Sequence, residues 1–397
     1  MIRKIVTTFL FFFISNPVFS QLNTVKSIKL ESLNQKQSTI IFDKNDNINI
    51  SFDILGEKKS DYYFTITHCD YKWNPSKISK FEYIEGFDDI RINDYFFSDN
   101  TFQSYTNFNF QIPNQNFKIK LDGNYLVKVF DDNYNLIFER KIIIKNKIFN
   151  ALINITRSKK ISDSPSTQNI QVLFSNTENI VFNSTSDYKL VVIKNNDFRS
   201  SKTFSSPRLQ TGSRLVYDNI VFKGGSEYLY FDSKNILLTS SEIKQVNFKN
   251  IYNTVLYTDF EESIYTLNPD LNGTFIINVN CLEKKICADY SNVNFSLKTE
   301  KSYDSDIFII GGFNNNEISE KYKLRKLDKN YYGIELILKQ GLYNYKYVTE
   351  IGDEFEDLSN FWQTENNYKA ILYEKKITDR YYKIIGFGEK NSNKIVN

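Results

Sequence analysis

The chain has 397 residues, which at about 100–200 residues per domain predicts two to four domains and ample length for a buried core. Tyr (27) and Phe (34) are abundant while Gly (14) and Pro (6) are scarce, a balance that favours β-sheets and excludes a low-complexity or disordered chain. The 50 basic and 47 acidic residues give a formal net charge of +3, too even a balance to predict nucleic acid or an anionic membrane as partner.

Residues 1–20 have the pattern of a secretory signal peptide. Arg3 and Lys4 form a short basic end, Ile5 to Ile14 is the apolar core, and small or apolar residues occupy positions 18–20. The alternative is a membrane anchor, but the apolar run is far shorter than the ~20 residues that a spanning helix needs. No cysteine follows the cleavage position, so lipid attachment is not expected there. We therefore expect a cleaved leader and a soluble, exported mature chain.

The first predicted domain spans residues 21–147 and consists of short strands. Residues 47–54 alternate apolar and polar side chains over their whole length, as a half-buried strand does. Asp122-Gly123 turns the chain into residues 125–130, and residues 136–144 follow as the second strand of a hairpin. Strands at this spacing, with turn residues between them, predict an immunoglobulin-like β-sandwich.

The stretch from Tyr62 to Tyr95 holds the single histidine of the chain and one of its two tryptophans. It begins as an alternating strand and breaks at Asn74-Pro75, a pair that favours a turn. Beyond the break, aromatic residues are interleaved with charged ones without a clean period, so they either fold back over a sheet or face a partner. Since Trp, Tyr and Arg dominate binding hot spots, we predict partner-contact residues in this stretch: Trp73, Phe81, Tyr83, Phe87, Arg91 and Tyr95.

Catalysis has little basis in this sequence. Neighbouring strand residues point to opposite faces, so His68 cannot readily form a dyad with Cys69, and a hydrogen-bonded histidine at a strand end is the expected role. Oxygen ligands such as those of Asp131-Asp132-Asn133 remain for a metal, but a solvated hairpin tip explains these residues better. Gly224-Gly225 and Gly311-Gly312 lack phosphate-loop spacing, and no motif indicates a glycosidase pair of carboxylates. We predict a non-catalytic protein with no metal and no cofactor.

Residues 148–300 predict a second β-sandwich-like domain, with an Asn272-Gly273 turn before one of its strands. Cys281 and Cys287 are separated by five residues, so in an oxidising compartment they either close a small loop as a disulfide or remain thiols. Cys69 is then left over, and a buried, inert thiol is the commoner fate of such a residue.

Residues 301–397 form the third predicted domain, in which residues 306–314 and 341–347 resemble the small sandwich modules of glycogen- and starch-active proteins. Such modules stack a tryptophan on the sugar just after this first segment, whereas this chain has Asn315-Asn316-Glu317 there. The resemblance therefore implies a retained fold without the sugar platform. Later in the domain, Phe361 and Trp362 lie among uncharged polar residues that bind either a partner's backbone or a neighbouring loop.

Several ordered blocks of the sequence resemble the plug proteins of the type IX secretion system, which is found in the Bacteroidota. The blocks cover nearly the whole mature chain and read THCDYKWNPS, EYIEGFDDIRINDY, GNYLVKVFDD, GGSEYLYFD, NPDLNGTFIINV and FWQTENNYKAILYE. Several separate matches in the same order are far more specific than any one of them.

The resemblance implies an all-β periplasmic protein of serial β-sandwich domains. It implies that the chain binds the periplasmic mouth of the large outer-membrane translocon barrel and closes the pore when no substrate is being exported. Association with the membrane would then occur only through that partner. The alternative hypothesis, which rests on the third domain, is a periplasmic or surface glycan-binding protein.

Overall fold

The computed structural model describes residues 24–32, 39–56, 60–146, 149–175, 182, 184–352 and 354–393, so the predicted leader at 1–20 lies outside the described residues. The all-β prediction is confirmed, because strands dominate and the two described α-helices, α1 (Lys80–Tyr83) and α2 (Lys284–Cys287), have four residues each. No helix among these residues has the length and apolar character needed to cross a bilayer.

The first group of strands forms a sandwich that we call the N-terminal sandwich. One sheet has the order β1-β3-β8-β7 and the facing sheet the order β2-β11-β10-β4-β6, with a small β5-β9 pair beside them. Aromatic rings from both sheets share one core; Tyr62 packs edge-on against Phe108 with ring centroids 4.8 Å apart. The strands are β1 (Val25–Ser32), β2 (Ile41–Asp43), β3 (Ile48–Leu55), β4 (Tyr62–Cys69), β5 (Ile84–Gly86), β6 (Ile90–Arg91), β7 (Asp94–Phe97), β8 (Tyr105–Ile112), β9 (Phe117–Ile119), β10 (Gly123–Asp131) and β11 (Leu136–Lys145).

The second group, the split sandwich, combines strands from two distant parts of the sequence. Its sheet has the order β15-β14-β29-β30-β12-β13-β17-β16, and β12 meets β30 at only two residue pairs. The two halves of this sheet bury one shared core, which includes Ile153, Phe174, Leu190 and Leu372. The strands are β12 (Phe149–Arg157), β13 (Thr167–Ser175), β14 (Tyr188–Lys194), β15 (Asp197–Phe204), β16 (Leu209–Thr211), β17 (Arg214–Lys223), β29 (Asn367–Glu374) and β30 (Lys383–Asn391).

The third group, the inserted sandwich, lies between β17 and β29 in the sequence. One sheet is built on β18-β27-β22 with β24 and β28 also paired to β27, and the other has the order β19-β20-β23-β26-β25 with β21 beside β23. Its core stacks Tyr343 between Phe231 and Phe275, with centroid distances of 5.2 and 5.4 Å. The strands are β18 (Leu229–Asp232), β19 (Ile243–Phe248), β20 (Tyr252–Leu256), β21 (Asp259–Phe260), β22 (Phe275–Ile277), β23 (Tyr290–Lys298), β24 (Ile307–Ile310), β25 (Arg325–Asp328), β26 (Tyr331–Lys339), β27 (Gly341–Ile351) and β28 (Glu354–Asp357).

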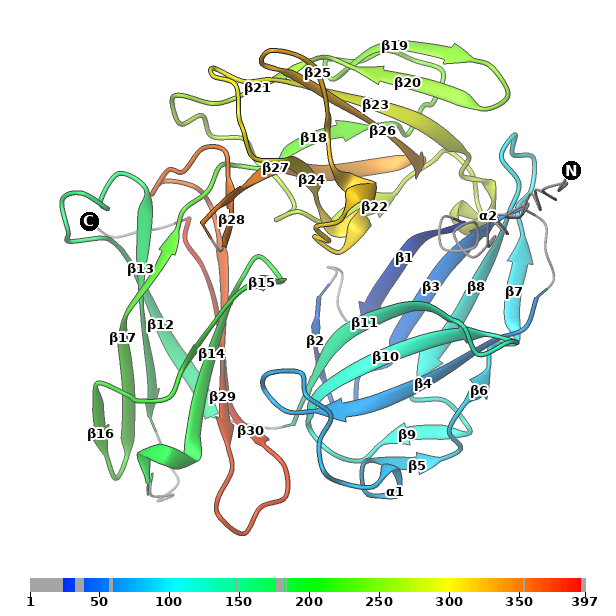
Figure 1. Cartoon of the computed structure of the whole chain (residues 1–397). Coiled ribbons are helices and arrows are strands. Elements are labelled where there is room, and N and C mark those ends of the chain that lie inside the picture. The colour runs from blue at the N-terminus through cyan, green and yellow to red at the C-terminus, as the bar shows by residue number, and fades with distance from the viewer. Residues whose placement is uncertain are drawn as a thin grey trace, which may run out of the picture.

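This strand order corrects the predicted division into residues 148–300 and 301–397. β29 pairs with β14, and β30 with β29, so the last strands of the chain complete the split sandwich and do not belong with the segment before them. The pairing joins segments far apart in the sequence, and local strand patterns carry no information about such a return. Figure 1 shows the three sandwiches around a common centre, with β11, β15 and β28 bordering it.

Candidate functional site

Three of the six predicted contact residues between Trp73 and Tyr95 are exposed: Phe81, Phe87 and Arg91. The phenylalanine side chains are 83% and 71% exposed, which is unusual for residues of this size. Phe96 and Phe97, on the edge strand β7, are also exposed. We call Phe81, Phe87, Phe96 and Phe97 the exposed aromatic set of the N-terminal sandwich.

Local hydrogen bonds hold Phe81 and Phe87 in place. A capping box starts α1, in which the backbone N–H of Ser79 donates to Glu82 Oε1 at 2.9 Å. The carbonyl oxygen of Phe81 accepts a hydrogen bond from Lys120 Nζ at 2.8 Å, and the backbone N–H of Phe87 donates to the carbonyl of Asn116 at 3.0 Å. Both rings are therefore displayed by an ordered backbone.

The other three predicted contact residues pack inside the protein. Tyr83 is only 4% exposed and belongs to the core of the N-terminal sandwich, so it offers no surface to a partner. The half-buried Tyr95 packs on Phe108, with ring centroids 5.7 Å apart. Trp73 packs against Phe198 of the split sandwich at 4.8 Å and thus forms part of a joint between two sandwiches.

His68 and Cys69 are structural residues of β4. The His68 ring is almost completely buried; it contacts Ser76 Oγ through Nδ1 at 2.8 Å and donates from Nε2 to the carbonyl of Asp122 at 3.1 Å. Burial lowers the pKa of His68 and raises that of the Cys69 thiol to about 11. A Cβ at Gly123 would lie 2.4 Å from His68 Nε2, so only glycine leaves room for this ring.

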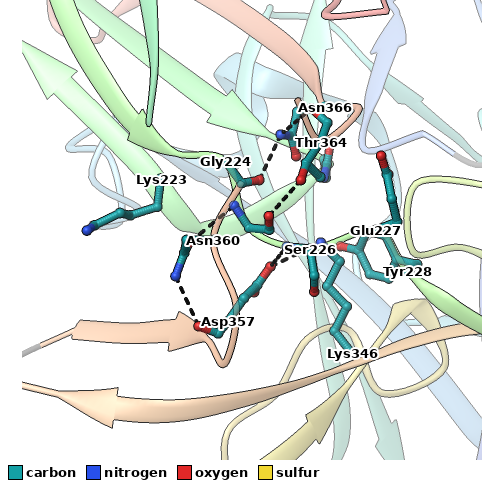
Figure 2. Close-up of polar contacts among 12 residues, drawn as sticks. Lys223, Gly224, Ser226, Glu227, Tyr228, Lys346, Asp357, Asn360, Thr364 and Asn366 are labelled. Carbon is teal, nitrogen blue, oxygen red and sulfur yellow. Dashed lines mark hydrogen bonds and ion pairs between the residues drawn. The ribbon is translucent and has the colours of Figure 1, made fainter. Parts of the chain in front are cut away.

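The remaining predicted contact residues, Phe361 and Trp362, lie at a joint between the split and inserted sandwiches. In Figure 2, the side chains of Thr364 and Asn366 point toward the backbone of the Gly224–Ser226 turn. Asn366 Nδ2 donates to the carbonyl of Gly224 at 2.8 Å, and Thr364 Oγ1 donates to that of Gly225 at 2.6 Å. We call this contact between the Gly224–Ser226 turn and residues 357–366 the glycine junction.

Two sequence blocks that are distant in the chain therefore bind each other at the glycine junction. The ring of Trp362 lies under the Arg157 guanidinium, 4.8 Å from its centroid, and the Trp362 carbonyl accepts a hydrogen bond from Gln168 Nε2 at 2.7 Å. A Cβ on Gly224 would lie 1.8 Å from the carbonyl oxygen of Phe361, so the two backbones approach too closely for any other residue. The structure thus places the Trp362 segment against a neighbouring loop.

An ion pair adjoins the glycine junction, between Lys346 of β27 and Asp357 of β28, with 3.1 Å between Nζ and Oδ2. Burial acts to raise the pKa of Asp357, but the charges of Lys346 and Lys194 outweigh it and hold that pKa below its usual value. The same carboxylate accepts the backbone N–H of Ser226 at 3.1 Å (Figure 2). Charge and hydrogen bonds together fix the inserted sandwich against the turn that leads into it.

Sequence reasoning missed a central cleft of about 1280 Å³ between the three sandwiches. Its lining includes basic side chains from all of them, among them Lys26, Arg140, Lys194 and Lys321. Each of these residues sits in its own segment with the pattern of an ordinary solvated lysine or arginine, and only the tertiary arrangement gathers them. In the described part of the chain, no group of three or more His, Cys, Asp or Glu side chains is arranged to hold a metal.

Comparisons with known proteins bear on both family and fold. Residues 25–146 match the family model of the type 9 secretion system plug protein 1st domain, which confirms the plug-family resemblance over the N-terminal sandwich. A crystal structure of a hypothetical protein from Parabacteroides merdae superposes with a TM-score of 0.88 at 24% identity, covering 93% of this chain and 97% of that chain, and shows a shared fold. The partial N-terminal region of an enterococcal surface protein superposes with a TM-score of only 0.20 at 7% identity, covering 96% of this chain and 97% of that chain, and is too dissimilar to indicate a shared fold. No curated protein matches the chain.

Proposed function

We propose, on the premise that residues 25–146 belong to the type 9 secretion system plug family, that this chain closes the periplasmic mouth of the outer-membrane barrel through which type IX substrates leave the cell. The family supports a role in type IX secretion. The finer proposal is that the chain sits in the periplasm, binds the barrel and seals its pore while no substrate is present, without catalysing a reaction.

The family match of the N-terminal sandwich carries this proposal, because the same unit displays the exposed aromatic set. Large aromatic side chains at a surface commonly anchor protein contacts. Here Phe81 and Phe87 each stand among polar residues, with Glu82, Glu85 and Asp88 close by in the sequence. A contact of mixed aromatic and polar character suits reversible binding better than a permanent, wholly apolar interface.

A plug must also resist deformation, and the three sandwiches are joined at every boundary. Asp53 and Lys339 form a buried ion pair between the N-terminal and inserted sandwiches. Tyr373 OH donates to Asn124 Oδ1 at 2.7 Å between the split and N-terminal sandwiches, and the glycine junction joins the third boundary. Buried polar contacts of this kind favour one fixed arrangement of the three units.

The direct test is deletion of the protein in a cell with an intact translocon. The open pore should admit large hydrophilic antibiotics, and unchanged permeability would count against the proposal. Cross-linking mass spectrometry on a detergent-extracted outer-membrane complex should then recover the barrel attached to this chain, with cross-links near α1 and β5.

Surface variants locate the contact. The double substitution Phe81→Asp and Phe87→Asp should leave the fold intact, since both rings are exposed, but should release the chain from the barrel and raise antibiotic uptake. Phe260→Asp is the matched control, because Phe260 is 65% exposed on the inserted sandwich. If the double variant and Phe260→Asp had equal effects, the N-terminal sandwich would not be the contact surface.

The glycan-binding alternative has its own readout. In a Trp73→Phe background Trp362 is the remaining tryptophan, so its fluorescence reports events at the glycine junction alone. A saturable change on titration with glycogen or other glycans would favour this alternative. We expect no change in Trp362 fluorescence, because the Arg157 guanidinium already covers the face of the ring on which a sugar would stack.

A further inference from the structure

Two walls of the central cleft are strand edges. Consecutive residues line it in both places, Ile137–Lys141 of β11 and Asp197–Lys202 of β15. Neighbouring residues of a strand point to opposite faces, so a strand that contributes consecutive residues presents its edge to the cleft. In Figure 1 both strands border the central space from different sandwiches.

Neither edge has a strand partner on its cleft side among the described residues. β15 ends its sheet and pairs only with β14. β11 pairs with β10 along its length, but on its other side β2 covers only Ile143–Lys145. Free N–H and C=O groups along such an edge are ready to pair with another chain, which is why proteins usually cover or blunt it.

Basic side chains outnumber acidic ones in the cleft lining. Among the described residues, two of the basic groups form no ion pair and bond to backbone oxygens instead. Arg140 donates to the carbonyl of Glu139, and Lys194 Nζ donates to that of Lys223, both at 2.9 Å. Some acidic side chains of the lining already form ion pairs, as Asp197 does with Arg199.

Burial makes these cations costly. Burial, together with the charge of Lys321, lowers the pKa of Lys26 to about 8. Burial lowers the pKa of Lys194 to about 8, although the charges of Asp357 and Asp197 act in the opposite direction. Burial lowers the pKa of Arg140 to about 10, against the opposing effects of Tyr322 and Glu317. A carboxylate that entered the cleft would be attracted to each of these groups.

We propose that the central cleft binds an extended, acid-rich polypeptide segment of a partner protein, which adds as a strand to the open edge of β15 while its carboxylates meet Arg140, Lys194 and Lys321. Edge pairing supplies backbone hydrogen bonds and the lining cations supply selectivity, as in other cases of strand addition. The volume of about 1280 Å³ exceeds the roughly 300–1,000 Å³ of small-molecule pockets and suits a chain segment. The site is separate from the exposed aromatic set, so it stands or falls independently of the barrel contact.

The test uses the mature protein and a fluorescent eight-residue peptide of alternating Glu and Val, which matches the length of β15. Fluorescence anisotropy should show saturable binding that weakens as salt rises. The same peptide with Lys in place of Glu should bind at least about ten-fold more weakly, since like charges repel. A version N-methylated at alternate residues keeps the charges but loses backbone N–H donors, and its binding affinity should also fall at least about ten-fold.

Protein variants assign the cations. Arg140→Gln and Lys321→Gln should each weaken peptide binding by about five- to ten-fold, consistent with the loss of one charge-assisted contact. Lys249→Gln changes an exposed lysine outside the cleft and should leave binding unchanged. Thermal melting checks that each variant is folded.

Three results would overturn the proposal: equal binding of acidic and basic peptides, full binding of the N-methylated peptide, or equal effects of Lys249→Gln and Arg140→Gln. Competition by free glutamate as strong as by the peptide would reduce the site to a small-anion pocket and also overturn it. A concentration-dependent dimer that the peptide dissociates would instead assign the cleft to a second copy of this chain.

Discussion

Asp53 of β3 and Lys339 of β26 form an ion pair with 2.7 Å between Oδ2 and Nζ, although both side chains are almost completely buried. The pair joins the N-terminal and inserted sandwiches. Tyr290 OH donates to the same carboxylate oxygen at 2.6 Å, and Asn107 Nδ2 donates to the other at 2.6 Å. Taking two charges out of water is costly unless their hydrogen bonds are satisfied, as they are in this network.

Asp53→Asn should therefore be strongly destabilising, because it leaves the Lys339 ammonium buried without a counter-charge. We expect a loss of about 3–5 kcal/mol in the free energy of unfolding, measured by urea denaturation. Asp163→Asn, which breaks an exposed ion pair with Lys160, is the control and should change stability little. The double variant Asp53→Leu with Lys339→Met should recover much of the loss; equal small effects of Asp53→Asn and Asp163→Asn would contradict this account.

The Cys281–Cys287 disulfide should support the same boundary. It closes the loop that carries α2, and the carbonyl of Lys285 in this loop accepts hydrogen bonds from Lys339 Nζ at 2.7 Å and Tyr105 OH at 3.1 Å. Reduction frees the loop in the unfolded chain and should lower stability by about 2 kcal/mol, a size typical for a short disulfide loop. Thermal unfolding with and without reductant measures the change.

The double variant Cys281→Ser with Cys287→Ser is the matched control for that experiment. It should unfold at the lower temperature and show no further response to reductant, since Cys69 is a buried free thiol. Faster amide exchange in β8 and β26 should accompany the loss. If reductant left the unfolding temperature of the wild-type protein unchanged, the disulfide loop would not stabilise this boundary.

Asp259 should make the stability of the inserted sandwich depend on pH. Burial raises its pKa to about 6, against the opposing hydrogen bonds from Tyr347 and Tyr345. Because the folded pKa exceeds the unfolded value, the protonated carboxyl stabilises the fold below about pH 4, and this contribution is lost as the pH rises through 6. The pKa difference corresponds to about 3 kcal/mol.

Asp259→Asn removes that titration. Relative to wild type, the variant should therefore gain up to about 3 kcal/mol between pH 4 and pH 7, as measured by urea unfolding at each pH. Tyr347→Phe deletes a hydrogen bond to the carboxylate and should shift the wild-type transition to higher pH. A stability difference that stays flat with pH would falsify the assignment.

Local pattern carried the sequence predictions that the structure confirms. The alternation in residues 47–54 and the hairpin between 125–130 and 136–144 appear as β3 and the β10–β11 pair, because strand alternation and turn residues are signals within short windows of sequence. Predicted contact residues fared unevenly. Phe81 and Phe87 are exposed while Tyr83 is buried, and an aperiodic aromatic segment gives no signal that separates the two cases.

The amino-acid sequence by itself determined the all-β class, several of the strands and the plug-family resemblance, since these depend on residue types and spacings within short windows. Only the tertiary structure decided that β29 and β30 return to the split sandwich, that the Gly224–Ser226 turn binds the Trp362 segment, and that Arg140 and Lys194 share a cleft. Each of those relationships joins residues that are remote in the chain. Their energies come from packing and charge across sandwich boundaries, which no local pattern encodes.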